Sequence, residues 1–150
     1  MAYALDHEED ALPPVPTRAA VEADIAEWQA RVAHLLKTVE AWISQDGGFQ
    51  VLHGSKTVFE RRMQMVGITE PYDVPILSIE RDGRGLVLFP EYRWVTGTRG
   101  QLVLSDGDRL HCVADGGTAD APDWVLIRDG SIHLEPFTRE VFLQLLEAME

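Results

Sequence analysis

Five Asp-Gly dipeptides between residues 46 and 130 constrain the fold of this chain more than any other feature of its sequence. They are Asp46-Gly47, Asp82-Gly83, Asp106-Gly107, Asp115-Gly116 and Asp129-Gly130. Asp and Gly tolerate the positive φ angles that tight hairpin turns require. Short runs rich in β-branched and aromatic residues lie between these dipeptides, so the sequence predicts an antiparallel β-meander from Phe49 to Glu135.

We expect six to nine strands in this meander. The candidate ranges are 49–53, 57–66, 74–81, 84–89, 92–96, 101–105, 109–114, 124–128 and 131–135. The stretch DGGTADAPD, residues 115–123, predicts the longest loop. Its aspartates, Asp115, Asp120 and Asp123, are expected to be solvated turn residues, with a calcium site as the alternative.

A long helix is predicted before the meander, from residue 18 to residue 45, with Thr17 as its N-cap. Its apolar residues are spaced alternately by four and three positions, a pattern we call the seam: Val21, Ile25, Trp28, Val32, Leu35, Val39 and Trp42. Such a helix is about 42 Å long, whereas a domain of this size has a radius of gyration of about 15 Å. Two alternatives follow. Either the seam packs wholly on the chain's own sheet, or part of it forms the interface of a homodimer.

A second helix is expected at the C-terminus, where Thr138 is a plausible cap and Phe137 is placed to contact Phe142. The predicted fold class is therefore α+β, a long N-terminal helix packed on an antiparallel β-meander and closed by a C-terminal helix. The acidic, proline-rich residues 1–16 are expected to form a flexible arm, and residues 17–150 a single domain.

The charge of the chain restricts its partners. The formal net charge is −12, and only residues 56–99, with seven basic and six acidic groups, are close to neutral. An acidic surface disfavours nucleic-acid binding, because attraction to phosphates needs a positive footprint. No apolar run is long enough for a membrane span, and no secretory signal is visible.

The single cysteine, Cys112, cannot form an internal disulfide, which indicates a reducing compartment, and we expect a cytoplasmic protein. Cys112 itself is expected to be buried as a small hydrophobic residue. Arginine outnumbers lysine eleven to two, which is typical of a GC-rich, most often bacterial, coding sequence.

Patterns that carry catalysis are missing from the sequence. His133 and Glu135 lie on one face of a predicted strand, but no third group is visible to complete a site. Phosphate-loop, nucleophile-elbow and metal-ligand spacings do not occur. We therefore expect no catalytic residue, no metal and no cofactor, and the question of an enzymatic activity stays open.

The stretch GRGLVLFPEYRWVTGTRG, residues 83–100, is the best candidate for a binding surface. The residues selected in and near it are basic or aromatic: Arg61, Arg84, Tyr92, Arg93, Trp94 and Arg99. Acidic residues are interleaved with them, so no continuous positive stripe results. Ordinary sheet packing and a groove for a protein or small ligand are both compatible with this pattern.

These features favour a non-catalytic, cytosolic protein-interaction module, such as an adaptor, a secretion-type chaperone or an immunity-like protein, acting as a homodimer. Its partners would be another protein or a second copy, without nucleic acid or membrane. The alternative is a small-ligand-binding or enzymatic domain that uses the sheet surface around Arg61, Arg93 and Trp94.

Overall fold

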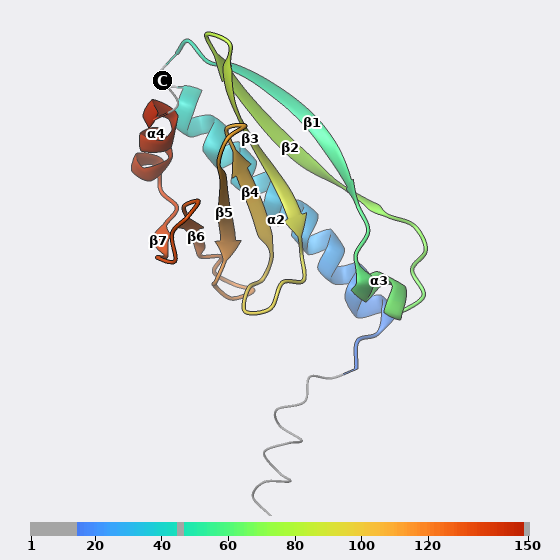
Figure 1. Cartoon of the computed structure of the whole chain (residues 1–150). Coiled ribbons are helices and arrows are strands. Elements are labelled where there is room, and N and C mark those ends of the chain that lie inside the picture. The colour runs from blue at the N-terminus through green and yellow to red at the C-terminus, as the bar shows by residue number, and fades with distance from the viewer. Residues whose placement is uncertain (1–14, 45–46, 149–150) are drawn as a thin grey trace, which may run out of the picture.

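The computed structural model describes residues 15–44 and 47–148, and it confirms the predicted α+β fold. Seven antiparallel strands form one sheet in which each strand pairs with its neighbours in the sequence, from β1 to β7. Helix α2 passes diagonally behind the sheet, and α4 lies near the C-terminal end of α2 (Figure 1). The predictions for Asp46 and for most of the N-terminal arm fall outside the described residues.

Helix α2 spans Arg18–Ser44, close to the predicted range. The backbone N–H of Ala20 donates to Thr17 Oγ1 over 3.1 Å, which satisfies one of the unpaired donors of the first turn. Six of the seven seam residues are buried within the single chain: Val21, Ile25, Trp28, Val32, Leu35 and Val39. These six residues therefore belong to the core of the single chain, whereas Trp42 is half-buried.

Asp82-Gly83 and Asp106-Gly107 lie in short connections between successive strands, as predicted, whereas Asp115-Gly116 begins the longer loop 116–123. Asp82 and Gly83 have φ angles of 53° and 79° and connect the first long hairpin. The strand bounds are β1 Gln50–Val58, β2 Tyr72–Arg81, β3 Arg84–Tyr92, β4 Gln101–Ser105, β5 Leu110–Asp115, β6 Trp124–Ile127 and β7 Glu135–Pro136.

The predicted strand 57–66 is wrong. Strand β1 continues through Gly54 to Val58, and Arg61–Met65 form a short helix, α3. Burial there follows a spacing of three, with Glu60 and Met63 inside and Phe59 and Met65 exposed. The alternation of large apolar residues resembles a strand in sequence, but a helical turn is what places Met63 in the core.

Two further predicted strands are also wrong. Residues 93–100 form the β3–β4 loop instead of a strand over 92–96, because the carboxylate of Glu60 binds the backbone N–H groups of Arg93 and Trp94. Those donors are then unavailable to a neighbouring strand. Of the predicted strand 131–135, only Glu135 lies in a strand, as the first residue of β7.

Helix α4 spans Arg139–Ala148 and begins as predicted. The backbone N–H of Val141 donates to Thr138 Oγ1 over 3.3 Å. The rings of Phe137 and Phe142 lie 6.0 Å apart between centroids, and Trp42 contacts both rings at 5.5 Å and 5.8 Å. These three aromatic residues close the core between α4 and the end of α2.

The two faces of the sheet differ. One face carries the core side chains under α2, including Leu88, Leu102 and Val113. On the other face Phe89, Val103, Cys112 and Ile127 lie side by side across β3 to β6. Cys112, which was predicted to be buried, is half-buried, because the register turns its neighbours His111 and Val113 towards the core instead.

None of the helices in the described ranges 15–44 and 47–148 is long and apolar enough to cross a membrane.

Candidate functional site

An apolar groove of about 560 Å³ lies between α2 and β6. One wall is a stripe of α2 that recurs at every third or fourth residue: Glu27, Ala30, Arg31, His34, Leu35, Thr38 and Trp42. The opposite wall consists of Pro122, Trp124 and Phe137. At 1.5 Å per residue the helical wall extends over about 22 Å. Its volume and apolar lining fit the usual dimensions of a ligand site.

Aromatic rings held by the core form much of the groove. Trp124 packs against the buried Trp28, with centroids 6.4 Å apart, and Trp42 packs edge-on against Phe137. Trp42 and Trp124 are both half-buried, so each presents part of its ring to the groove. Because their inner edges are fixed by these contacts, the rings form a preorganised apolar surface.

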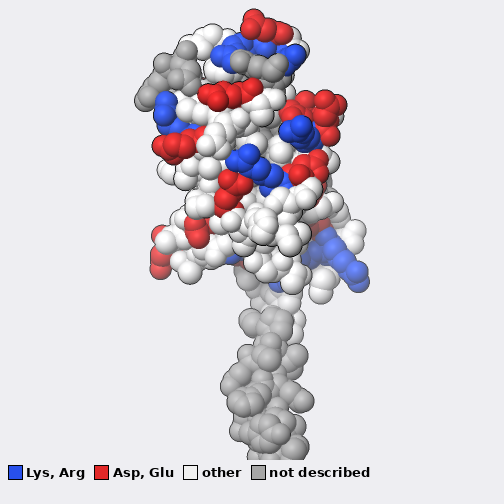
Figure 2. Space-filling view, turned by 60° about the vertical axis from the view of Figure 1, so that its left-hand side comes forward, with Lys and Arg blue, Asp and Glu red and all other residues white. Residues whose placement is uncertain are grey.

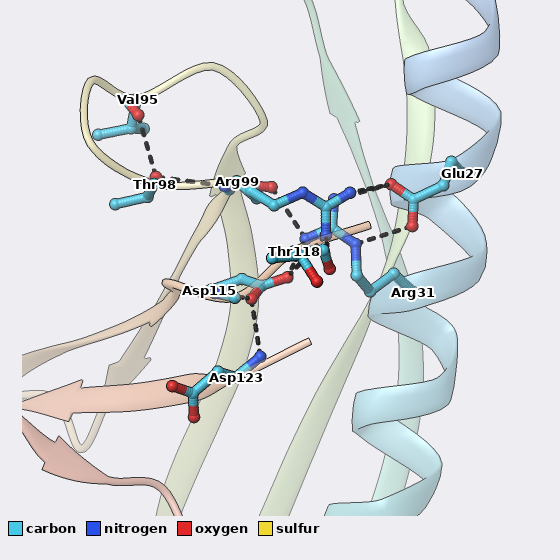
Figure 3. Close-up of polar contacts among 10 residues, drawn as sticks. Glu27, Arg31, Val95, Thr98, Arg99, Asp115, Thr118 and Asp123 are labelled. Carbon is cyan, nitrogen blue, oxygen red and sulfur yellow. Dashed lines mark hydrogen bonds and ion pairs between the residues drawn. The ribbon is translucent and has the colours of Figure 1, made fainter. Parts of the chain in front are cut away.

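A largely buried ionic network lies at the end of the groove that Glu27 and Arg31 line. Figure 3 shows its contacts. Arg31 Nε and Nη2 donate to the two carboxylate oxygens of Glu27 over 2.8 Å and 2.9 Å. Arg31 Nη1 donates to Asp115 Oδ2 over 2.6 Å and to the carbonyl oxygen of Arg99 over 2.9 Å. The Arg31 guanidinium also lies over the Trp28 ring, 4.9 Å from its centroid.

Asp115 is the centre of this network and is fully buried. Its Oδ1 accepts the backbone N–H groups of Gly117 and Asp123, each over 2.9 Å. The Arg99 guanidinium completes the arrangement, with Nη1 3.4 Å from Asp115 Oδ2 and Nη2 3.3 Å from Glu27 Oε1. The prediction that Asp115 is a solvated turn residue is therefore wrong, because its charge is paired inside the protein.

The network is electrically balanced, since two guanidinium groups face two carboxylates. The hydrogen bond from Arg31 holds the pKa of Glu27 below its ordinary value. Most of the donors of Arg31 are already engaged, so it is not available to bind an anionic ligand. We interpret the network as the rigid end wall of the groove.

The structure separates the binding residues that the sequence selected. Tyr92 ends β3, and Arg93, Trp94 and Arg99 lie together in the β3–β4 loop. Arg84, at the start of β3, lies at the opposite end of the sheet from that loop.

Arg61 lies on α3 rather than on a strand, and it follows Glu60, whose carboxylate binds the loop. Its neighbour Arg62, which the sequence did not select, is the α3 residue that reaches Trp94, with its guanidinium carbon 5.8 Å from the ring centroid. Arg93 lies at the same distance from that ring.

The predicted His133–Glu135 pair does not form a site. Residues 131–134 form no strand, so the shared face on which the pair depended is missing. Glu135 instead binds Arg128, with Oε2 2.8 Å from Nε. Among the described residues, no group of three or more His, Cys, Asp or Glu side chains is placed to hold a metal ion.

Charged side chains of both signs are interleaved on the face seen in Figure 2, and no continuous basic surface appears there. Beside the groove, the loop 116–123 contains Asp120 and Asp123 and no basic residue. The Glu27 carboxylate on the α2 side is 44% exposed, but it is paired with Arg31 and Arg99. The surroundings of the groove are thus acidic, like the chain as a whole.

No family model, curated protein or solved structure matches this chain.

Sequence reasoning did not find the groove. Trp42 was selected only as a seam residue, and Trp124 and Phe137 lie more than 80 positions further along the chain. One signal was present: Trp42 is, with Trp28, the bulkiest residue of the seam, and it stands at the end of the helix, where a core tapers towards the surface. Nothing local indicated what would lie opposite it.

Proposed function

We propose that this protein is a non-catalytic protein-interaction module whose groove binds a basic, amphipathic segment of a partner protein. The observation that carries the proposal is the open aromatic groove along α2. An adaptor, a secretion-type chaperone and an immunity-like protein, the roles considered from the sequence, would each need a surface of this kind.

The shape of the groove suits a segment of a chain. Its helical wall is about 22 Å long, which matches about four turns of helix or about seven extended residues. Ala30 is exposed on that wall and leaves room for a partner backbone to approach. Apolar side chains of the partner would pack on Trp42, Trp124 and Phe137, as in helix-in-groove recognition.

The charges favour a cationic partner. Arg31 and Arg99 are neutralised by Glu27 and Asp115, so they contribute no net positive field. The adjacent loop 116–123 adds two carboxylates, and the whole chain has a net charge of −12. Such a field accelerates association with basic segments and opposes acidic ones.

A labelled 15-residue peptide of alternating leucine and lysine clusters, amphipathic as a helix, provides a defined probe for fluorescence anisotropy. A matched peptide with glutamate in place of lysine tests the charge requirement. The variant Ala30→Trp fills the groove from an exposed position, whereas Ala26→Trp places the same ring on an exposed position of α2 that does not line it.

We expect the lysine peptide to bind the unmodified protein and Ala26→Trp, to lose at least about tenfold in affinity for Ala30→Trp, and to be preferred over the glutamate peptide. Equal binding to the two variants would show that the groove is not the site. Homodimerisation stays a separate prediction, and light scattering at tens of micromolar tests it directly.

A further inference from the structure

Two arginines and a tryptophan meet at the other side of the ionic network, where α3 approaches the β3–β4 loop. The guanidinium carbons of Arg62 and Arg93 each lie 5.8 Å from the centroid of the Trp94 ring. The two cationic groups are therefore at most twice that distance apart. Arg62 is exposed, so the position can be reached from solvent. We call Arg62, Arg93 and Trp94 the arginine corner.

Arg93 has an unmet hydrogen-bonding group. Its Nε is buried, and no acceptor within the described residues lies in hydrogen-bonding range of it. Burial also holds the pKa of Arg93 below its ordinary value, since removal from water disfavours the charged guanidinium. A buried donor without an acceptor costs stability, which a shift of the Arg93 side chain towards a bound anion would relieve.

The nearby carboxylates are occupied elsewhere. Glu60 accepts the Tyr72 hydroxyl over 2.6 Å and the backbone N–H groups of Arg93 and Trp94 over 3.1 Å and 3.2 Å. Its charge therefore fixes the loop backbone rather than pairing with a guanidinium. Glu27 is engaged by the ionic network.

Asp24 is then the carboxylate whose charge acts most strongly on Arg93, and it lines the same hollow as Arg62. The exposed Arg61 beside Arg62 adds a further positive charge at the corner. In an otherwise acidic chain, this corner has more cationic than anionic side chains.

We propose that the arginine corner binds a small oxyanion of the phosphate class, with Arg62 and Arg93 as its ligands beside Trp94. Planar guanidinium groups match the oxygen geometry of phosphate. An anion would also offset the repulsion that Arg31 and Arg99 exert on Arg93. The hydrogen bonds from the backbone N–H groups of Arg93 and Trp94 to the Glu60 carboxylate position Arg93 even without a bound anion. This inference does not depend on the groove or on its proposed partner.

Titration calorimetry with inorganic phosphate and with phosphoserine, at low ionic strength, tests the site. We expect Arg62→Gln and Arg93→Gln each to lower the affinity at least about tenfold, since each removes a charge-assisted hydrogen-bonding group. Asp24→Asn should raise the affinity severalfold by removing the opposing charge. Arg109→Gln, at the end of the sheet opposite the β3–β4 loop, is the matched control and should bind as the unmodified protein does.

Circular dichroism verifies that each variant is folded. Phosphatidic acid vesicles in a sedimentation assay distinguish a lipid headgroup from a free phosphate group: sedimentation that requires Arg62 would support the same chemistry on a lipid. No measurable phosphate or phosphoserine binding by the folded protein, together with no vesicle binding, would overturn the proposal. So would affinity unchanged in Arg62→Gln and Arg93→Gln.

Discussion

The Nη1 atom of Arg31 lies 2.6 Å from Oδ2 of Asp115, and the two residues are 84 positions apart in the chain. Both side chains are almost completely removed from solvent. This ion pair fastens the middle of α2 to the end of β5. It also sets the position of the loop that follows β5, because the other oxygen of Asp115 binds backbone N–H groups of that loop.

Removing one member of this pair should be costly. We expect Asp115→Ala to lower the free energy of unfolding by about 3–5 kcal/mol, because it removes the fully buried counter-charge of Arg31 and leaves two backbone N–H groups without their acceptor. Urea denaturation measures the change. Glu135→Ala, which breaks the more exposed pair with Arg128, should cost no more than about 1 kcal/mol. Equal, small losses in both variants would contradict a structural role for the buried pair.

Gly100 is expected to tolerate no side chain. Its φ angle is 132°, and an added Cβ would lie 2.6 Å from Cη2 of the buried Trp28. Gly100→Ala should therefore destabilise the protein by about 3 kcal/mol or more, from overpacking and backbone strain together. Gly107→Ala is the control, because Gly107 also has a positive φ angle but open space around it. The difference between the two variants therefore measures the clash with Trp28. Thermal unfolding that is identical in the two variants would show that Trp28 can move aside.

The carboxylate of Glu60 should be irreplaceable by an amide. Glu60→Gln keeps the shape but has a single acceptor oxygen, so its NH2 group faces either the Tyr72 hydroxyl and the second contact of Arg93 N–H or the shared contact of Arg93 and Trp94. We expect a loss of about 1–3 kcal/mol and faster hydrogen exchange confined to the β3–β4 loop. Tyr72→Phe removes only one of the bonds to Glu60 and should cost about 1 kcal/mol. If the loop amides of Glu60→Gln exchange hydrogen as slowly as those of the unmodified protein, this account is refuted.

His111 should make stability depend on pH near neutrality. Burial holds its pKa below the ordinary value, although the carboxylates of Asp106 and Asp129 act in the opposite direction. The unfolded chain then binds a proton at higher pH than the folded chain, so the free energy of unfolding should decrease as pH falls below about 6.5. Urea titrations at pH 7.5 and 5.5 measure this decrease.

His111→Asn offers an acceptor to the backbone N–H of Asp129, as Nδ1 does now over 2.9 Å, but does not titrate. Its stability should change less between the two pH values than that of the unmodified protein. His133→Asn, at an exposed position, should leave the dependence intact. A dependence that survives in His111→Asn would have to arise from other groups.

Local patterns were enough to predict most of the fold. The seam spacing predicted α2 because burial of one helix face follows the 3.6-residue period, whatever the partner surface is. The turn at Asp82-Gly83 was predictable because few other residues adopt its φ angles. The prediction was wrong where a distant side chain decides the local structure. Glu60 ends β3 near Arg93, and the sequence around Arg93 does not reveal that contact.

The same limit applies to the site. The Asp115-Gly116 dipeptide resembles its four counterparts, and local propensity therefore predicted a solvated turn. Its burial depends on Arg31, a residue that belongs to α2. The loop that carries Arg93, Trp94 and Arg99 was selected correctly as a cluster of cationic and aromatic residues, but Arg62 could be added only once α3 replaced the predicted strand.

The strand order has a consequence for how the chain folds. Every strand pairs with its neighbour in sequence, so each hairpin closes only a short loop and needs no distant segment. Helix α2 precedes all of them, yet its buried face contacts strands from several of these hairpins, and its link from Arg31 to Asp115 cannot form before β5 is in place. We therefore expect α2 to dock late in folding and to detach early in unfolding, so that substitutions on its inner face would speed unfolding far more than they slow refolding.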